Sequence, residues 1–279
     1  MTTWTAGRLR DLAAQIRRDV LEMSHRAQTA HLGSSLSCVE LIAAAYGGGL
    51  CLDPTRRQHA DRDRLIFSKG HAATTLYAAL ARCGFFPISW LQEYAQPGSP
   101  LSEHPHRGVP GVEAATGSLG HGLSLGLGMA LAARIRGWKN RVAVILSDGE
   151  CNEGSTWEAA LFAPAQRLGS LLAVIDYNKW QATGRSNEIT ALAPLADKWR
   201  AFGWQAEECD GHDVAAVRDR MLAVEPGLIG PPTVLIAHTV KGRGVSFMED
   251  DNNWHYRSPN DEELAAALNE LSILSTEPR

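Results

Sequence analysis

The chain contains 279 residues, 44% of them hydrophobic and 21% charged, and carries a formal net charge of −4. These values are typical of a soluble globular protein with a sizeable core, and the slight excess of acidic residues argues against a general nucleic-acid binder. Five scattered cysteines without a CxxC pair predict reduced thiols, and the lack of a signal core or of a membrane-length apolar stretch predicts a cytoplasmic protein that does not bind membranes.

The first half of the chain combines helical patterns with one short strand. Apolar residues at helical spacing predict helices over 6–29 and 36–46, and a loop at 31–35 lies between them. The other elements expected in this half are a strand at 65–67, a helix ending near residue 82, a short helix within 87–95, a long loop at 96–111, and a helix that opens at 117–122 and ends near residue 134.

The second half alternates strands and helices regularly. The expected elements are strands at 142–146, 171–175, 204–208 and 233–237, helices at 154–168, 195–202, 214–223 and 262–274, and polar loops at 181–194 and 241–253. This alternation predicts one α/β domain with a doubly wound, mostly parallel sheet and helices on both faces.

Two apolar runs in the middle of the chain each end in an oxygen-bearing side chain. Asp148 follows the run at 142–146, and Asn178 follows the run at 171–175. The two residues are about 30 positions apart, which suits one strand–helix–strand unit. Ligands of open α/β sheets bind outside the carboxyl ends of the strands, where a carboxylate and an amide oxygen suit a hard cation that also holds a phosphate. The alternative is that both residues are ordinary turn or cap residues.

Two neighbouring features either bind an anion or only begin a helix. The small residues at 117–122 let backbone N–H groups approach an anion. No strand leads directly into them and no Gly-Lys-Ser/Thr follows, which disfavours a nucleotide- or dinucleotide-binding protein. Glu150, Glu153 and Glu158 open the next helix, where carboxylates also interact favourably with the helix dipole.

Several of the ten histidines fall in expected loops. They are His31, His71, His104, His106, His121 and His255. One such histidine is usually a surface or capping group, but several at helix starts predict a polar cleft for proton transfer and for binding hydroxyls or phosphates. No HExxH spacing is present, so a zinc site is not expected.

Five segments, in the same order, resemble motifs of the thiamine-diphosphate-binding half of transketolase, most closely of the split type in which this half is a separate chain. They are Ala30-His31-Leu32-Gly33, residues 63–71, residues 110–122, Ser147-Asp148-Gly149-Glu150 with 153–160 and Asn178, and residues 239–249 with Trp254-His255. The chain departs from the family pattern at Ala30, Ser147 and Tyr256, which replace glycines, and at His121, which replaces a glutamine. The resemblance implies the family's thiamine-diphosphate-binding fold as a single (PP) domain over 1–279.

The resemblance also implies how thiamine diphosphate and Mg²⁺ (or Ca²⁺ or Mn²⁺) are bound. The implied metal ligands are Asp148, Asn178 and the backbone carbonyl of Trp180. The residues implied to line or contact the cofactor are His71, Gly117, Leu119, Asp148, Gly149, Asn178 and His255. The implied catalytic residues are His31 and His104, which face the thiazolium and the donor ketose, and Glu153, which interacts with a catalytic glutamate of the partner.

The implied activity is transfer of a two-carbon ketol unit from a ketose or ketose-phosphate donor to an aldose acceptor. The pyrimidine and C-terminal domains of full-length members are expected on a partner chain, a C-terminal transketolase subunit, in an α2β2 heterotetramer with sites at the interfaces. The alternatives are a related thiamine-diphosphate synthase or ligase, of the deoxyxylulose-phosphate synthase or specialised-metabolism kind, and a non-catalytic regulatory subunit.

Overall fold

Five strands form a parallel sheet at the centre of the computed structural model, which describes residues 4–276, with side chains to residue 272. In spatial order they are β1 (Arg64–Phe67), β2 (Val142–Ser147), β3 (Leu171–Tyr177), β5 (Thr233–His238) and β4 (Gln205–Asp210). Neighbouring strands all pair in parallel. The predicted doubly wound α/β fold is confirmed.

The central strands are apolar along their length because both of their faces are covered. β2 and β3 are buried at every residue, whereas β4, at the edge, has only exposed and half-buried residues. Successive side chains of β2 point to opposite faces: Ala143 and Ile145 pack into one core cluster, and Val144 and Leu146 pack into the other.

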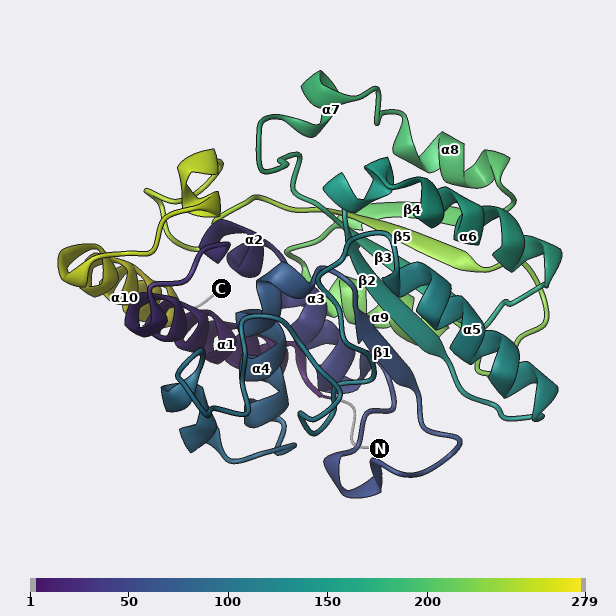
Figure 1. Ribbon diagram of the computed structural model, residues 1–279, viewed down its shortest axis with the longest axis horizontal. Helices are drawn as coiled ribbons and strands as arrows, with labels where there is room; N and C mark the ends of the chain where they lie inside the picture. Colours follow the sequence, from purple (N-terminus) through teal and green to yellow (C-terminus); the bar gives the residue numbers. More distant parts are fainter. Residues whose placement is uncertain (1–3, 277–279) are drawn as a thin grey trace.

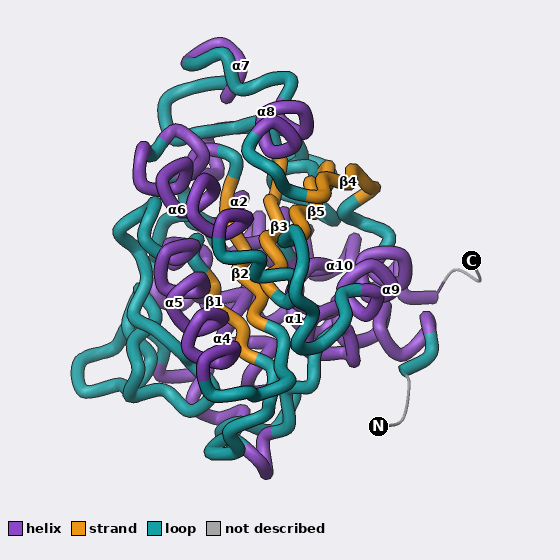
Figure 2. The backbone as a smooth tube through the Cα atoms, turned by 90° about the vertical axis from the view of Figure 1, so that its right-hand side faces the viewer, coloured by secondary structure: helices purple, strands orange, loops and turns teal. Residues whose placement is uncertain are grey.

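Helices form a layer on each face of the sheet. One layer contains α1 (Ala6–Ala27), α2 (Leu32–Ser37), α3 (Val39–Ala44), α4 (Ala73–Arg82), α9 (Val214–Ala223) and α10 (Asp261–Thr276). The other contains α5 (Gly122–Ile135), α6 (Gly154–Ala165) and α8 (Leu195–Ala201). Figure 1 shows α1, α4 and α10 grouped to one side of the sheet, and Figure 2 shows the strands between α5 and α6 on one side and α9 and α10 on the other.

The predicted loop at 31–35 is wrong, because α2 begins directly after His31. Gly33 is not a helix breaker here: a Cβ at this position would lie 3.1 Å from Lys241 Cγ and 3.3 Å from Trp254 Cβ, so glycine permits close packing against the helix. The helix predicted over 36–46 is divided at Cys38 into α2 and α3 and continues as a π-helical turn at Ala45–Gly49.

Smaller differences arise at helix ends and in loops. The helix predicted over 154–168 ends at Ala165, because Arg167 adopts a left-handed backbone (φ 51°) and closes the end with a backbone bond to Pro164. The loop predicted at 181–194 contains a short helix, α7 (Ser186–Ile189). Short 3-10 helices lie at Pro54–Arg56, Gly70–Ala72, Ile88–Glu93, Gly149–Asn152 and Asn252–His255. Within the described residues, no helix has the length and apolar character needed to span a membrane.

Candidate functional site

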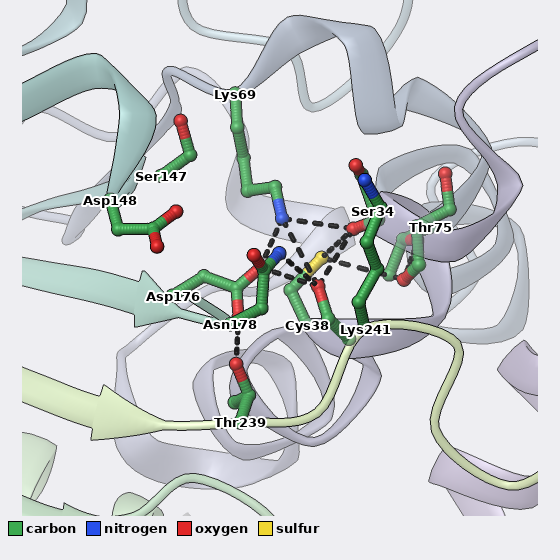
Figure 3. A network of polar contacts seen from close by, with 12 residues as sticks. Ser34, Cys38, Lys69, Thr75, Ser147, Asp148, Asp176, Asn178, Thr239 and Lys241 are labelled. Carbon is green, nitrogen blue, oxygen red and sulfur yellow. Dashed lines mark hydrogen bonds and ion pairs between the residues drawn. The ribbon is translucent and has the colours of Figure 1, made fainter. Parts of the chain in front are cut away.

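Polar side chains follow the carboxyl ends of four neighbouring strands and meet at one edge of the sheet. Lys69 follows β1, Asp148 follows β2, Asn178 follows β3, and Thr239 follows β5. Figure 3 shows these four side chains around Asp176, the penultimate residue of β3. The register of the parallel strands thus brings Asp148 and Asn178 to the same edge, as their spacing predicts.

Asp148 is fully buried and is held by three donors. The backbone N–H groups of Gly149 and Lys179 donate to it at 2.9 Å each, and Ser186 Oγ donates at 2.8 Å. Burial, together with the nearby Asp176 charge, raises its pKa to about 7 although the hydrogen bonds act in the opposite direction. A buried carboxylate of this kind gains most from a bound cation, which would favour its ionised form.

Asn178 is oriented by its neighbours at the end of β3. Its Nδ2 donates to Ser37 Oγ at 3.2 Å, and its Oδ1 accepts the Trp180 backbone N–H at 3.0 Å. These two contacts determine the orientation of the Asn178 side-chain amide, with its oxygen toward the turn at Trp180. Trp180 and Gly149, both implied by the family resemblance, lie half-buried in the turns that follow β3 and β2.

A buried ion pair that sequence reasoning missed lies beneath these residues. Lys69 Nζ is paired with Asp176, and both side chains are 0% exposed. Asp176 also accepts hydrogen bonds from Ser37 Oγ, at 2.6 Å, and from Thr239 Oγ1. Dashed lines in Figure 3 show the contacts of Lys69 and Thr239 with Asp176. The signal available in the sequence was a charged residue directly after, or at the end of, an apolar strand.

The three glutamates after β2 separate into one buried and two exposed residues. Glu150 is fully buried and accepts hydrogen bonds from Ser68 Oγ and from the Gly120 N–H, the latter at 2.9 Å. Burial raises its pKa. Ser147, which replaces a family glycine, accepts the Glu150 N–H at 3.2 Å and so stabilises the turn. Glu153 and Glu158 are exposed, and the Glu153 side chain makes no cap hydrogen bond at the start of α6.

Three of the predicted histidines come together from distant segments. The ring centroid of His31 lies 5.2 Å from that of His71 and 5.0 Å from that of His255. Burial, reinforced by neighbouring His104 and Lys241, lowers the pKa of His31 to about 4, and burial with Lys241 lowers that of His255 to about 3. Burial also lowers the pKa of His71. The three rings are therefore neutral at pH 7.

The remaining predicted histidines have different surroundings. His104 is exposed, and its ring lies against Gly117. His106 is exposed and holds its own loop, since its ring contacts the Pro100 carbonyl at 3.0 Å and accepts the Gly108 N–H at 3.1 Å. His121 is exposed at the start of α5 and makes no cap hydrogen bond.

Lys241 is a second buried lysine that sequence reasoning did not single out. Its Nζ donates to Asn252 Oδ1 at 2.6 Å and to His255 Nδ1 at 2.9 Å. Burial, with the nearby Lys69 charge, lowers its pKa to about 8. Both buried lysines stand directly before a glycine after a strand, and this repeated pattern was the available signal.

Glycines allow the turns around the site to approach each other closely. A Cβ at Gly70 would lie 2.6 Å from the Gly117 backbone nitrogen, so the turn after β1 packs directly on the turn before α5. Gly117 has φ 139°, and a Cβ there would overlap the His104 ring. Leu119, in the same turn, is half-buried.

The donor set suits a hard cation and an anion. Asp148 and Asn178 supply a carboxylate and an amide oxygen, the ligands that Mg²⁺ and Ca²⁺ prefer. Within residues 4–272, no three His, Cys, Asp or Glu side chains cluster with metal-binding geometry, so a site of the zinc kind has no support there. Neutral imidazoles and buried lysine nitrogens next to the oxygen ligands supply the donors that phosphate oxygens and hydroxyls accept.

Comparison with known proteins gives consistent matches over almost the whole chain. Residues 9–277 match the family model described as transketolase, thiamine diphosphate binding domain. The chain is 41% identical over 262 residues to one subunit of the apulose-4-phosphate transketolase of Actinobacillus succinogenes, covering 93% of this chain and 94% of that protein. It is 42% identical over 268 residues to 6-deoxy-6-sulfo-D-fructose transketolase subunit SqwG of a Clostridium species, covering 94% of this chain and 96% of that protein. A solved transketolase variant from Pichia stipitis superposes with a TM-score of 0.88 at 25% identity, over 98% of this chain and 42% of that one.

The parallel sheet with helices on both faces defines an α/β protein of the open-sheet class, whose members bind ligands at the carboxyl edge, where Asp148 and Asn178 lie. Within that class, the chain belongs to the transketolase family of transferases and corresponds to its thiamine diphosphate binding domain. Because it matches separately encoded subunits over nearly their full length, it is an N-terminal transketolase subunit of the split type.

Proposed function

We propose that this chain is the thiamine-diphosphate-binding subunit of a Mg²⁺-dependent transketolase, which transfers a two-carbon ketol unit from a ketose to an aldose. The observation that supports this most is the meeting of Asp148 and Asn178 at the strand ends, beside the neutral rings of His31, His71 and His255. Lys241 connects the two groups, since its Nζ lies 2.9 Å from His255 Nδ1 and its pKa, which burial lowers, is also influenced by the nearby Asp148.

In this proposal Asp148, Asn178 and the Trp180 backbone carbonyl hold Mg²⁺, and Ca²⁺ or Mn²⁺ can replace it because they share its oxygen ligands. Gly149 and Gly117 line the diphosphate and aminopyrimidine. A Cβ would approach Gln181 at Gly149 and His104 at Gly117, so glycine lets these walls of the site pack closely.

The remaining cofactor and catalytic roles fall to residues around the histidine rings. His71 and His255 donate to the diphosphate, and Leu119 packs on the aminopyrimidine. When bound, thiamine diphosphate supplies the nucleophilic carbon and the electron sink. His31 and His104 orient the hydroxyls of the donor ketose and move protons at its oxygens.

The proposed donor is a ketose that carries an anionic group. Two relatives are named for such sugars, apulose 4-phosphate and 6-deoxy-6-sulfo-D-fructose. The panel of donor substrates to be assayed therefore contains these two ketoses and common ketose phosphates.

The outer surface of α5 and α6 supports the need for a partner subunit. A surface helix normally turns polar residues outward, yet these helices expose Leu125 and Ile135 on α5 and Leu161 and Phe162 on α6, with exposed fractions of 41–75%. Glu153 is the exposed N-cap residue of α6, one of the two helices that carry this apolar face. We propose that a C-terminal transketolase subunit covers this face, in an α2β2 assembly that brings Glu153 to the partner's catalytic glutamate.

The proposed function is tested by assaying this chain and a C-terminal transketolase subunit, separately and together, with thiamine diphosphate, Mg²⁺ and the donor panel. Two-carbon transfer is expected only from the mixture. Strong transfer by the chain alone contradicts the split site, cofactor binding without any transfer favours a regulatory subunit, and a different carbon–carbon bond formation favours a synthase.

Replacing Leu161 with aspartate is expected to weaken assembly with the partner by at least about tenfold, because a charge would be buried in the apolar face. The side chain is 64% exposed in this chain, so the fold itself should be unaffected. Ile88→Asp, at an equally apolar but separate site that is 46% exposed, is the matched control. Sedimentation velocity of the mixtures measures the result, and equal effects of the two variants contradict the proposed face.

Replacing Gly117 with alanine is expected to lower the affinity for thiamine diphosphate by about tenfold or more, since about 1.4 kcal/mol is enough for that factor. The added Cβ would push into His104 at a backbone angle that alanine disfavours. Gly98→Ala is the matched control, because it also has a positive φ (82°) but meets no atom within 4 Å. Calorimetry on the assembled enzyme measures both affinities; a loss of similar size in Gly98→Ala would assign the effect to backbone strain alone.

A further inference from the structure

A buried carboxylate outside the cofactor edge joins three distant segments. Glu40, on α3, accepts from Arg17 Nη2 at 2.5 Å through one oxygen and contacts His212 Nδ1 at 3.0 Å through the other. The three side chains are 9–11% exposed. Burial acts to raise the pKa of Glu40, but Arg17 and His212 outweigh it and hold the pKa at about 2, so the carboxylate is ionised at neutral pH.

The two partners of that carboxylate hold opposite ends of one turn. His212 Nε2 accepts the Val240 backbone N–H at 2.8 Å, and Arg17 Nε donates to the Arg243 carbonyl at 2.9 Å. The intervening backbone is fixed from the other side, because the Gly242 N–H donates to the Gly33 carbonyl at 3.0 Å. The turn at 240–243 therefore has its position set by α1, α2, α3 and the loop after β4.

The turn carries Lys241, which determines where His255 holds its proton. A lysine ammonium only donates, so His255 Nδ1, 2.9 Å from Lys241 Nζ, is the acceptor and the ring proton lies on Nε2. The same reasoning applies to His212. A backbone N–H only donates, so His212 Nε2 is an acceptor and its proton lies on Nδ1, toward Glu40.

We propose that His212 is a positioning residue: with Glu40 and Arg17 it holds the turn at 240–243 so that Lys241 keeps His255 protonated on Nε2. This inference rests on the proposed function in one respect, namely that His255 donates to the cofactor diphosphate. An orienting partner of a binding histidine acts in the same way in metal sites, where its loss costs about 10–100-fold in affinity.

Two amide substitutions separate the two hydrogen bonds of His212, because each amide reaches the position of only one ring nitrogen. In His212→Gln the amide reaches the position of Nε2 and can still accept the Val240 N–H, whereas in His212→Asn the shorter amide reaches only the position of Nδ1 and keeps the contact with Glu40. Val240 is the direct link to the turn. We therefore expect His212→Asn to raise the Kd for thiamine diphosphate with Mg²⁺ by about 10-fold or more, and His212→Gln to restore most of the affinity.

The decisive readouts are kcat at saturating cofactor and the ¹⁵N shifts of the His255 ring in the ¹⁵N-histidine-labelled chain. His212→Asn is expected to leave kcat within about twofold, an order-of-magnitude bound for loss of binding alone, and to move the His255 shifts away from the pure Nε2–H form. Unchanged His255 shifts, or equal losses in the Asn and Gln variants, overturn the proposal. His25→Asn, which removes a histidine–carboxylate contact to the exposed Asp261, is the control and should change neither quantity.

The variant His255→Ala distinguishes a failure of this inference from a failure of the proposed function. If His255→Ala weakens cofactor binding but His212→Asn does not, His212 has no positioning role and the proposed function stands. If His255→Ala leaves cofactor affinity unchanged, the role of His255 at the diphosphate is wrong, and the inference is overturned with it.

Discussion

Replacing Asp148 with alanine is expected to abolish Mg²⁺-dependent binding of thiamine diphosphate to the assembled enzyme, with an affinity loss greater than about 100-fold. Removing only an outer partner of a metal ligand costs about 10–100-fold, and this substitution removes the anionic ligand itself. Isothermal titration with cofactor and Mg²⁺ measures the loss directly. Unchanged binding would exclude Asp148 from the metal site.

Two further variants separate binding from folding in that experiment. Alanine leaves the three donors to Asp148 without an acceptor, so it also destabilises the chain. Asp148→Asn keeps the size and an acceptor oxygen but removes the negative charge, and it should lose cofactor affinity with a smaller loss of thermal stability. Asp197→Ala, which removes a carboxylate that is 67% exposed on α8, should bind the cofactor normally.

Replacing Lys69 with methionine is expected to destabilise the chain by about 3–5 kcal/mol, because it leaves Asp176 as a buried charge without its cation. Both side chains are 0% exposed, so water cannot take the place of the lysine without opening the site. The free energy of unfolding at pH 7, from denaturant titration, is the measurement.

The double variant Lys69→Met/Asp176→Asn tests the cause. It removes both charges and keeps an acceptor for Thr239, so it should recover a large part of the lost stability. Arg200→Met breaks a pair with Asp197 whose side chains are 51% and 67% exposed, and it should cost no more than about 1 kcal/mol. If Lys69→Met costs as little as Arg200→Met, or the double variant is no more stable than Lys69→Met, the buried pair is not the source of the effect.

The metal-site hypothesis could be made from the sequence because it depends only on where two strands end and on the spacing between them. Two apolar runs of strand length, one crossover apart, place Asp148 and Asn178 at one edge of any parallel sheet that they share. The histidine hypothesis was only partly within reach. His31, His71 and His255 gather, but His106 holds its own loop and His121 stands exposed, and loop position alone does not distinguish these cases.

The sequence by itself determined the α/β class, the strands and most helices, and the position of Asp148 and Asn178 at the strand ends, because periodicity and strand ends are local properties. Only the tertiary structure decided which charges pair. Lys69 and Asp176 are 107 residues apart, and Glu40 and His212 are 172 apart. It also decided that residues 32–37 are helical. Gly33 within this helix packs closely against the side chains of Lys241 and Trp254, which come from the other end of the chain. Contacts between such distant residues depend on burial and geometry that no local pattern contains.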